Sequence, residues 1–208
     1  MTTLNPQLTR RRIGLTGGIA TGKTTVADYV RTHYTLPILD ADRYAREAVL
    51  PESPILITIA ERYGADLVRL DGTLDRPRLG EIIFVDQAER RWLEAQIHPF
   101  VCDRIHQDLQ THGQAPTVVL VIPLLFEAQM TDLVSEIWVV SCERVQQQQR
   151  LMDRNQLTLE QANARIESQM PLSEKLAQAD VVLDNAQDLA TLHQQVDEAI
   201  KSAPTSGA

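Results

Sequence analysis

A glycine-rich segment at residues 17–24 constrains this chain more than any other feature. It reads Gly-Gly-Ile-Ala-Thr-Gly-Lys-Thr and matches the pattern G-x-x-x-x-G-K-[ST]. The apolar run from Arg12 to Thr16 precedes it and suits a buried parallel strand, and a helical pattern follows from Lys23 to Tyr34. Glycines at such a junction let backbone N–H groups and a helix N-terminus surround a phosphate. The sequence therefore predicts a phosphate-binding loop in a parallel α/β fold.

Two side chains of this loop carry its expected chemistry. Lys23 would reach the β- and γ-phosphates of a nucleotide, and the hydroxyl of Thr24 would ligate Mg²⁺. A chance glycine turn before a helix is the alternative, and the strand–loop–helix context disfavours it. Lys23 is one of only three lysines, with Lys175 and Lys201, so no neighbour in the sequence can replace it.

Composition excludes several classes of protein. The chain has 208 residues, with 20 Lys and Arg against 28 Asp and Glu, which gives a formal net charge of −8. This balance argues against binding to nucleic acid by bulk charge. Cys102 and Cys142 form no C-x-x-C pair, so neither a disulfide framework nor a zinc site is expected. There is no run long enough to span a membrane and no signal peptide, and we expect a cytoplasmic protein without membrane or nucleic-acid partners.

Further along the chain, strands and helices alternate. Strands are predicted at Leu36–Leu39, Thr117–Ile122, Ile137–Val140 and Val181–Leu183, whereas residues 42–113 show helical patterns and no clear strand. We read those residues as an insertion over the carboxyl ends of the strands, where open α/β sheets bind ligands. The expected segments are a flexible N-terminus (1–10), core (11–41), helical insertion (42–113), core (114–142), lid region (143–175), core (176–202) and flexible tail (203–208).

Several classes of nucleotide-binding protein are disfavoured because the chain lacks their motifs. No Asp lies three residues before any of the nine glycines, so the D-x-x-G segment of a switch GTPase is lacking. Asn185-Ala-Gln-Asp188 has Ala186 where the guanine-binding N-K-x-D motif needs Lys. Pro123 follows the strand at Thr117–Ile122, where a motor ATPase would usually have an acid. A small-molecule kinase is more consistent with these residues.

Two pairs of charged residues could serve such a kinase. Asp40 and Asp42 follow the second strand, and one could deprotonate an acceptor hydroxyl while the other holds Mg²⁺ or its waters. Both could instead cap the next helix. Arg150 and Arg154 are four residues apart on a predicted helix and could cover a γ-phosphate. Surface pairing with nearby acids is equally compatible with their spacing.

Short motifs recur in a characteristic order along nearly the whole chain. They are Ile13-Gly-Leu-Thr-Gly-Gly-Ile19 with its Gly-Lys-Thr-Thr continuation, Leu39-Asp-Ala-Asp42 with Ala45-Arg46, Asp71-Gly-Thr-Leu74, His98-Pro99, Ile122-Pro-Leu-Leu-Phe-Glu127, Arg150-x-x-x-Arg154, Gln169, and Ala179-Asp180 with Asp184-Asn185. Together they resemble the dephospho-CoA kinase family. The departures are mild: Ala20 and Thr21 stand where the family often has Gly and Ser, and Thr24 replaces a common Ser.

This resemblance implies a fold and a reaction. The fold is a three-layer P-loop kinase fold with a five-stranded parallel sheet, a helical CoA-substrate region at 42–113 and a lid. The reaction moves the γ-phosphoryl group of ATP to the ribose 3′-hydroxyl of dephospho-CoA, with Mg²⁺, and gives CoA and ADP. Alternatives are a P-loop kinase for a nucleoside or another small alcohol, and a nucleotide-binding switch without catalysis. The sequence leaves the oligomeric state open.

The resemblance also assigns roles to residues. Asp42 is implied as the base, with Lys23, Arg150 and Arg154 as the other catalytic residues. His98 is a structural or a substrate-side residue, and Glu127 could bind substrate or brace the site. The implied ATP-binding residues are Gly17, Gly18, Ile19, Ala20, Thr21, Gly22, Lys23, Thr24, Thr25 and Asn185. The implied substrate-binding residues are Asp40, Asp42, Arg46, His98 and Glu127, and the implied metal ligands are Thr24 and Asp40.

Overall fold

The computed structural model describes residues 10–202, so the flexible ends expected from the sequence lie almost wholly outside the described residues. The chain divides into two compact units, one formed by Met1–Asp40 with His112–Ala208 and the other by Ala41–Thr111. We call them the core unit and the helical unit and describe each by itself. No helix between residues 10 and 202 is long and apolar enough to cross a membrane.

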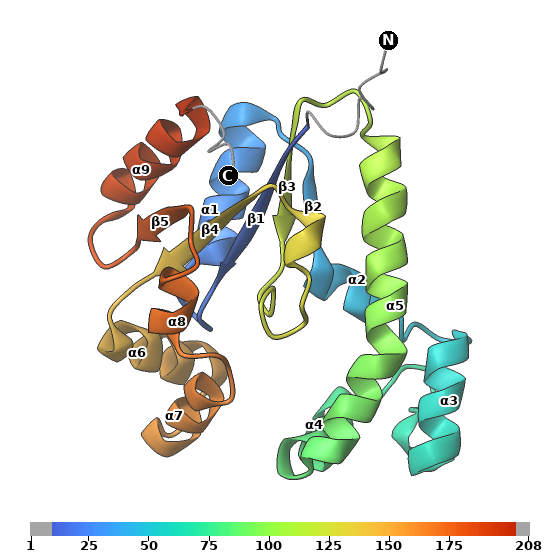
Figure 1. Ribbon diagram of the computed structural model, residues 1–208. Coiled ribbons are helices and arrows are strands. Elements are labelled where there is room, and N and C mark those ends of the chain that lie inside the picture. Colours follow the sequence, from blue (N-terminus) through green and yellow to red (C-terminus); the bar gives the residue numbers. More distant parts are fainter. Residues whose placement is uncertain (1–9, 203–208) are drawn as a thin grey trace. The chain divides into compact units, whose positions relative to one another are not determined.

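The core unit is built on a parallel sheet of five strands in the order β2-β3-β1-β4-β5 (Figure 1). The strands are β1 (Arg11–Gly17), β2 (Ile38–Asp40), β3 (Thr117–Val121), β4 (Glu136–Ser141) and β5 (Val181–Asp184). β1 is central, pairing with β3 through Ile13 and Val119 and with β4 through Leu15 and Trp138. Its near-continuous burial explains the apolar run in the sequence, because both faces of a parallel strand are covered. The five-stranded parallel sheet expected from the sequence is confirmed.

The second strand lies later than the sequence indicates. The prediction was Leu36–Leu39, but β2 is Ile38–Asp40 and pairs with β3 alone. Pro37 has no N–H to donate, and only its carbonyl takes part, accepting from the N–H of Val119 at 3.0 Å. Pairing therefore begins after the proline, and Asp40 is the last residue of the strand.

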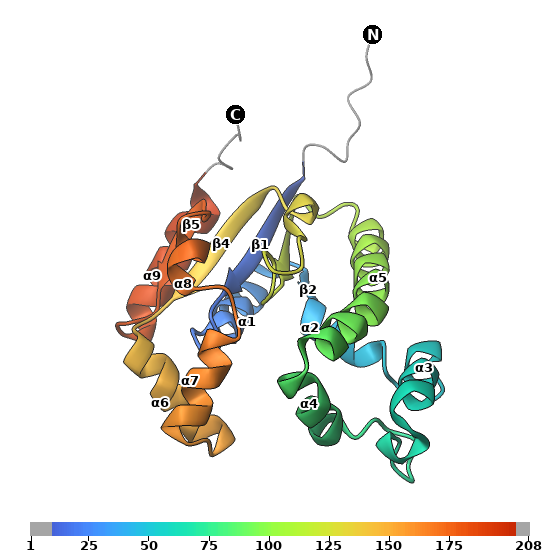
Figure 2. The same ribbon diagram turned by 60° about the horizontal axis from the view of Figure 1, so that its bottom comes forward.

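Helices flank the sheet of the core unit (Figure 2). They are α1 (Lys23–Tyr34), α6 (Arg144–Asn155), α7 (Leu159–Glu167), α8 (Leu172–Leu176) and α9 (Leu189–Lys201), with a 3₁₀ turn at Thr131–Leu133. Apolar residues of α1 and α9 pack with β1 and β4 in one cluster that includes Val26, Trp138 and Leu192. Thr158 and Gln161 form a capping box at the start of α7. This core holds the glycine-rich loop at the carboxyl end of β1.

The helical unit contains α2 (Ala41–Glu47), α3 (Pro54–Tyr63), a 3₁₀ turn (Ala65–Leu67), α4 (Arg76–Val85) and α5 (Gln87–Thr111). Its only strand-like pairing among described residues is an isolated bridge between Val68 and Leu74. In α5, Leu93, Val101 and Ile105 are buried and lie at multiples of four residues along the helix, so they form one apolar stripe. The unit has its own apolar cluster, which includes Ile59 and Leu67.

A buried ion pair lies at the start of the central strands. Arg11 Nε donates to Glu136 Oε2 at 2.8 Å, and Arg11 Nη2 donates to Oε1 at 3.1 Å. Trp138 Nε1 donates to the same carboxylate at 2.6 Å, and Arg11 also binds the carbonyls of Ala199 and Ile200. Only 2% of the Glu136 side chain is exposed. The pair thus joins β1, β4 and the end of α9, and removing one partner would leave a buried, unpaired charge.

We predict that Glu136→Ala lowers the free energy of unfolding by about 3–5 kcal/mol, because Arg11 would stay buried without its carboxylate. Urea unfolding followed by circular dichroism measures this. The matched control is Asp28→Ala, which removes the exposed pair with Arg31 and should cost about 1 kcal/mol or less. Equal effects of the two substitutions would contradict the account of the buried pair.

Candidate active site

The backbone of the glycine-rich loop needs glycine at two positions. Gly17 has φ +145° and Gly22 has φ +112°, values that side-chain-bearing residues rarely adopt. A Cβ on Gly17 would lie 2.3 Å from the carbonyl oxygen of Val140, and one on Gly22 would lie 2.1 Å from Asn185 Nδ2. The loop therefore approaches β4 and the end of β5 closely, and only glycine permits that approach.

Every carbonyl oxygen from residue 17 to residue 21 accepts a hydrogen bond from a side chain. Lys23 Nζ donates to the carbonyls of Gly17 at 3.0 Å and Gly18 at 2.7 Å. The carbonyl of Ile19 accepts from Gln147 Nε2 at 2.8 Å.

Arg150 completes this set from helix α6. Its Nη1 lies 3.3 Å from the carbonyls of both Ala20 and Thr21, and Asn185 Nδ2 donates to the Thr21 carbonyl at 2.7 Å. The Nη2 of Arg150 also binds the carbonyl of Asn185 at 3.1 Å. The negative ends of five consecutive peptide dipoles are thus all bound by protein donors.

The N–H groups of the same loop, unlike its carbonyls, mostly make no short hydrogen bond with residues 10–202. Within the described residues, the amides of Ala20 and Gly22 make no hydrogen bond, and the Thr21 amide makes only a long one of 3.4 Å to Gly18. Ile19 N–H donates to Gln169 Oε1 at 2.8 Å. The first N–H groups of α1, which begins at Lys23, have no intrahelical acceptor. Carbonyls that are bound by side chains, next to the amides of Ala20 and Gly22 that make no hydrogen bond among the described residues, are the arrangement expected of an anion-binding loop.

Helix α6 supplies two of the loop's partners from one face. Gln147 and Arg150 are three residues apart, so both side chains reach the loop. A capping box of Glu143 and Gln146 starts the helix, and Gln146 Nε2 also binds the carbonyl of Ala186 after β5. The sequence does not reveal this, because a short glutamine run such as residues 146–149 favours an interpretation as solvated helix surface. For Gln147 that interpretation is wrong, since only 4% of the residue is exposed.

Arg154 lies apart from the arginine that binds the loop. It is an exposed residue in the last turn of α6, and its Nε donates to Asn155 Oδ1 at 3.0 Å. The structure therefore brings Arg150 to the loop and leaves Arg154 exposed at the end of α6.

Cys142, between β4 and α6, was not expected near the site. Burial raises the pKa of its thiol, and the positive charges of Arg150 and Lys23 only partly oppose that effect. At neutral pH the thiol therefore stays protonated. No motif in the sequence predicts that Cys142 lies near the glycine-rich loop.

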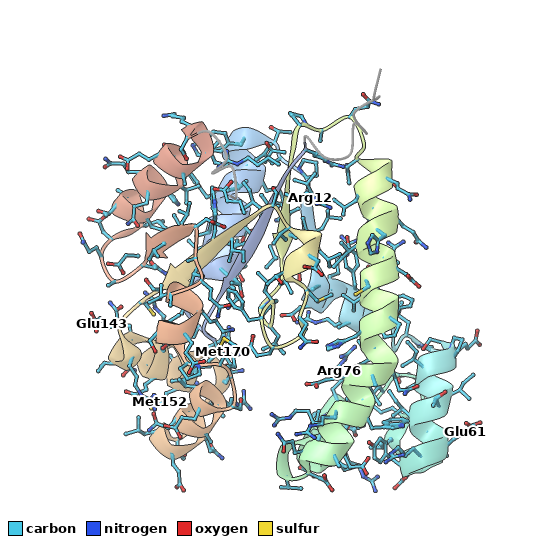
Figure 3. All side chains as sticks on the ribbon, in the orientation of Figure 1. Arg12, Glu61, Arg76, Glu143, Met152 and Met170 are labelled. Carbon is cyan, nitrogen blue, oxygen red and sulfur yellow. The ribbon has the colours of Figure 1, made fainter. Side chains whose placement is uncertain are left out.

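Glu127 bridges the segment after β3 to the segment after α7. Its Oε2 lies 3.1 Å from Nζ of Lys175, a fully buried lysine that also donates to the carbonyl of Pro123 at 3.0 Å. Its Oε1 accepts from the N–H of Met170, which Figure 3 labels between α7 and α8, at 3.0 Å. Within the core unit, Glu127 thus joins the segment between α7 and α8, and Lys175 of α8, to the segment that follows β3.

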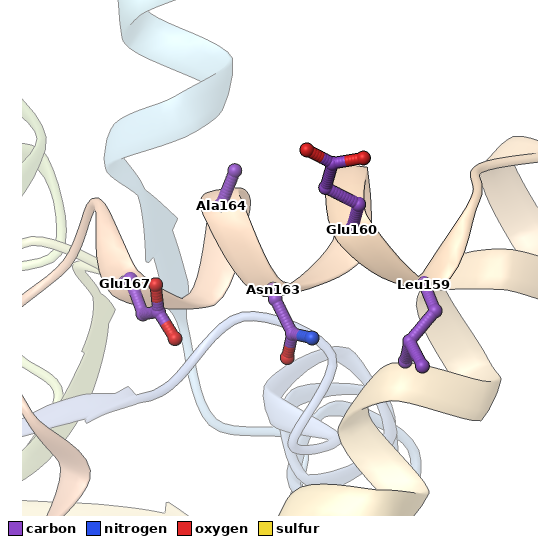
Figure 4. A pocket seen from close by; sticks show the side chains of 5 residues that line it. All are labelled: Leu159, Glu160, Asn163, Ala164 and Glu167. Carbon is purple, nitrogen blue, oxygen red and sulfur yellow. The ribbon is translucent and has the colours of Figure 1, made fainter.

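A pocket of about 650 Å³ lies along α7 (Figure 4). It is lined by Leu159, Glu160, Asn163, Ala164 and Glu167. Arg144 Nη2 donates to Asn163 and to Glu167, at 3.0 Å and 2.6 Å, and so ties α6 to α7. Two glutamates among five lining residues make this pocket unsuited to a phosphate.

The remaining candidate residues fall in both units. Asp40 ends β2 in the core unit and is half-buried. Asp42 is exposed in the first turn of α2, and Arg46 follows in the last turn of that helix. His98 is half-buried within α5, directly before Pro99. Asp42, Arg46 and His98 thus belong to the helical unit.

Comparison with known proteins is consistent with this geometry. A family model described as dephospho-CoA kinase matches residues 11–191. The dephospho-CoA kinase of Trichormus variabilis is 61% identical over 193 residues, covering 93% of this chain and 98% of that protein.

Two solved structures show the same likeness. The crystal structure of TT1252 from Thermus thermophilus has a TM-score of 0.80 and 32% identity, covering 92% of this chain and 96% of that one. Dephospho-CoA kinase from Campylobacter jejuni has a TM-score of 0.68 and 27% identity, covering 91% and 95%.

Proposed function

This chain belongs to the dephospho-CoA kinase family and phosphorylates dephospho-CoA with ATP, and on that premise we propose which of its residues bind and react. The observation that carries the proposal is the loop at residues 17–22, whose carbonyls from Gly17 to Thr21 are all bound by side chains while the amides of Ala20 and Gly22 make no hydrogen bond among the described residues. The γ-phosphoryl group leaves the β-phosphate of ATP as its bond to the ribose 3′-hydroxyl of dephospho-CoA forms. The hydroxyl proton passes to a carboxylate.

On the donor side, the loop residues from Gly17 to Thr25 hold the phosphates of ATP. Lys23 Nζ, which has three N–H donors, keeps its contacts with the carbonyls of Gly17 and Gly18 and also binds phosphate oxygens, which are strong acceptors because they are charged. Asn185 lies beside Gly22 and Arg150, so the segment after β5 and helix α6 support ATP together. Positioning and charge compensation supply most of the catalysis in such a site.

On the acceptor side, Asp42 takes the proton of the 3′-hydroxyl. Its carboxylate is exposed at the start of α2, so an acceptor hydroxyl can approach it. Asp40, Arg46, His98 and Glu127 are proposed to contact or position dephospho-CoA. For Glu127 this role is positional, through Lys175 and Met170.

The residues present suit Mg²⁺. Thr24 offers an exposed hydroxyl in the first turn of α1, and Asp40 offers a half-buried carboxylate at the end of β2. No group of three or more His, Cys, Asp or Glu residues that could hold a metal occurs in residues 10–202. Mg²⁺ accepts such a sparse protein site because it also binds water and substrate phosphates. When bound, it would neutralise charge on the β- and γ-phosphates.

The lid region at 143–175 brings cations to the phosphates. Arg150 is already at the loop, and Arg154 lies one turn further along α6. We propose that Arg154 joins Arg150 when ATP is bound, which requires its side chain to leave Asn155. The contacts of Gln169 and Glu127 couple the end of the lid to the loop and the sheet.

We predict that Asp42→Asn lowers kcat by about 10²-fold or more, the usual scale for a lost general base. Turnover at saturating ATP and dephospho-CoA measures this. The matched control is Asp103→Asn, an exposed carboxylate on α5, which should leave kcat unchanged. An unchanged kcat in Asp42→Asn would remove Asp42 from the role of base.

Lys23→Ala should abolish most of the kinase activity and weaken ATP binding, because the change removes both the phosphate contact and the support of Gly17 and Gly18. Calorimetric titration with Mg-ATP and steady-state rates measure the two effects. Lys201→Ala, at the exposed end of α9, is the control. Full activity in Lys23→Ala would refute the assignment of the phosphate site.

A further inference from the structure

Five of the nine arginines on the helical unit have a carboxylate partner, and among the four that have none within the described residues, Arg46 and Arg76 contact each other. The paired residues are Arg43 with Glu47, Arg62 with Glu89, Arg69 with Asp75, Arg78 with Asp66, and Arg104 with Glu47 and Asp108. Arg46 and Arg76 form no ion pair with any residue between 10 and 202. Their positive charges are therefore not balanced by a carboxylate in direct contact.

These two arginines lie together. Arg46 is in the last turn of α2, and Arg76 is the first residue of α4, where Figure 3 labels it. Arg76 Nη2 donates to the carbonyl of Arg46 at 3.4 Å. Although Arg76 is exposed as a residue, partial burial of its guanidinium and then the charge of Arg46 lower its pKa. Two cations held near each other favour the binding of an anion between them.

The nearest acid in the sequence does not cancel this charge. Asp75 precedes Arg76 and caps α4, accepting from the N–H of Arg78 at 3.3 Å. Its carboxylate also lies 3.2 Å from Arg69 Nη2. The carboxylate of Asp75 is thus bound by the Arg78 N–H and by Arg69, and it forms no ion pair with Arg76.

The position of Arg46 relates this pair to the reacting group. Asp42 and Arg46 are four residues apart on α2, so they lie on the same face, separated by about 6 Å along the helix axis. In dephospho-CoA, the 3′-hydroxyl and the 5′-diphosphate belong to one ribose and are a few bonds apart. A ribose with its 3′-hydroxyl at Asp42 therefore places its 5′-diphosphate within reach of Arg46.

We propose that Arg46 and Arg76 together bind the 5′-diphosphate of dephospho-CoA and thereby set the ribose 3′-hydroxyl against Asp42. The inference rests on the proposed function. Two guanidinium groups match the two negative charges of a diphosphate, and each can donate two parallel hydrogen bonds to phosphate oxygens. This pair distinguishes dephospho-CoA from a nucleoside, which has the same hydroxyl but no diphosphate.

A purely structural role for Arg76 makes a different prediction. If Arg76 only caps the carboxyl end of α2 through the carbonyl of Arg46, its loss would disturb α2 and Asp42 for every acceptor alike. If it binds the diphosphate, its loss affects only acceptors that carry one. Comparing an acceptor with and without the diphosphate separates the two roles.

The experiment uses the full chain with Mg-ATP and compares Arg46→Gln, Arg76→Gln and Arg76→Lys with the wild type. The matched control is Arg78→Gln, which removes the same charge two residues away on α4 from a residue paired with Asp66. Dephospho-CoA is one ligand and adenosine the other. Adenosine is followed as an acceptor and, where turnover is slow, as a competitive inhibitor against dephospho-CoA.

We expect Arg46→Gln and Arg76→Gln each to lower kcat/KM for dephospho-CoA by roughly 10- to 100-fold, the scale of one lost charge-assisted hydrogen bond. The constants for adenosine should change less than about threefold. Arg76→Lys should recover part of the loss, because it restores the charge without the planar fork. Arg78→Gln should match the wild type with both ligands.

Equal losses for dephospho-CoA and adenosine, or unchanged kcat/KM in both glutamine variants, would overturn the inference. So would a loss in Arg78→Gln as large as that in Arg76→Gln. The proposed function fails in a different way: the wild type would not phosphorylate dephospho-CoA, or Asp42→Asn would keep its full rate. A wild type that is active, together with arginine variants that are unaffected, would refute the diphosphate site alone.

Discussion

The hydrogen bonds that hold the five carbonyls from Gly17 to Thr21 are the constraint on which this site depends. A carbonyl oxygen that faced the phosphates would repel them, so each one must be turned toward the protein. Lys23 from the loop's own helix, Gln147 and Arg150 from α6, and Asn185 after β5 provide the donors. These elements are distant in the sequence, and the parallel sheet brings them together at the carboxyl ends of β1, β4 and β5.

The same contacts explain how an acidic chain binds polyanions. With a net charge of −8, the protein repels ATP and dephospho-CoA at long range, so attraction must come from a few fixed groups. In the core unit we propose that these groups are loop amides, Lys23 and Arg150. In the helical unit, Arg46 and Arg76 provide cationic charge without a carboxylate partner among the described residues. The positions of these few groups therefore matter more for the binding of anionic substrates than the net charge of the chain does.

The sequence predicted what depends on local pattern. Glycines at 17 and 22, the following Lys23 and the buried run of β1 specify the loop, because each requirement acts on neighbouring residues. It did not predict that Gln147 is buried under the loop, since its side chain is specified by a contact with Ile19 that lies 128 residues away.

Arginine roles were the hardest to predict from spacing. Arg150 and Arg154 share a helix face, yet only Arg150 reaches the loop, because α6 is near its end at Arg154. Arg76 gave no signal, since its neighbour Arg46 is thirty residues away and belongs to another helix. A pair of arginines such as Arg46 and Arg76 can be recognised only from a structure that shows which charged side chains have an ion-pair partner.

The central claim is that the loop is already held in its anion-binding form before ATP arrives. Amide hydrogen exchange of the nucleotide-free protein, resolved by residue, tests it at Ile19, whose N–H is bound to Gln169 while its carbonyl is bound to Gln147. We predict slow exchange at the Ile19 amide without nucleotide, and new protection at Ala20 and Gly22 when Mg-ATP is added. Exchange at Ile19 as fast as in an unstructured peptide, becoming slow only with Mg-ATP, would contradict the claim.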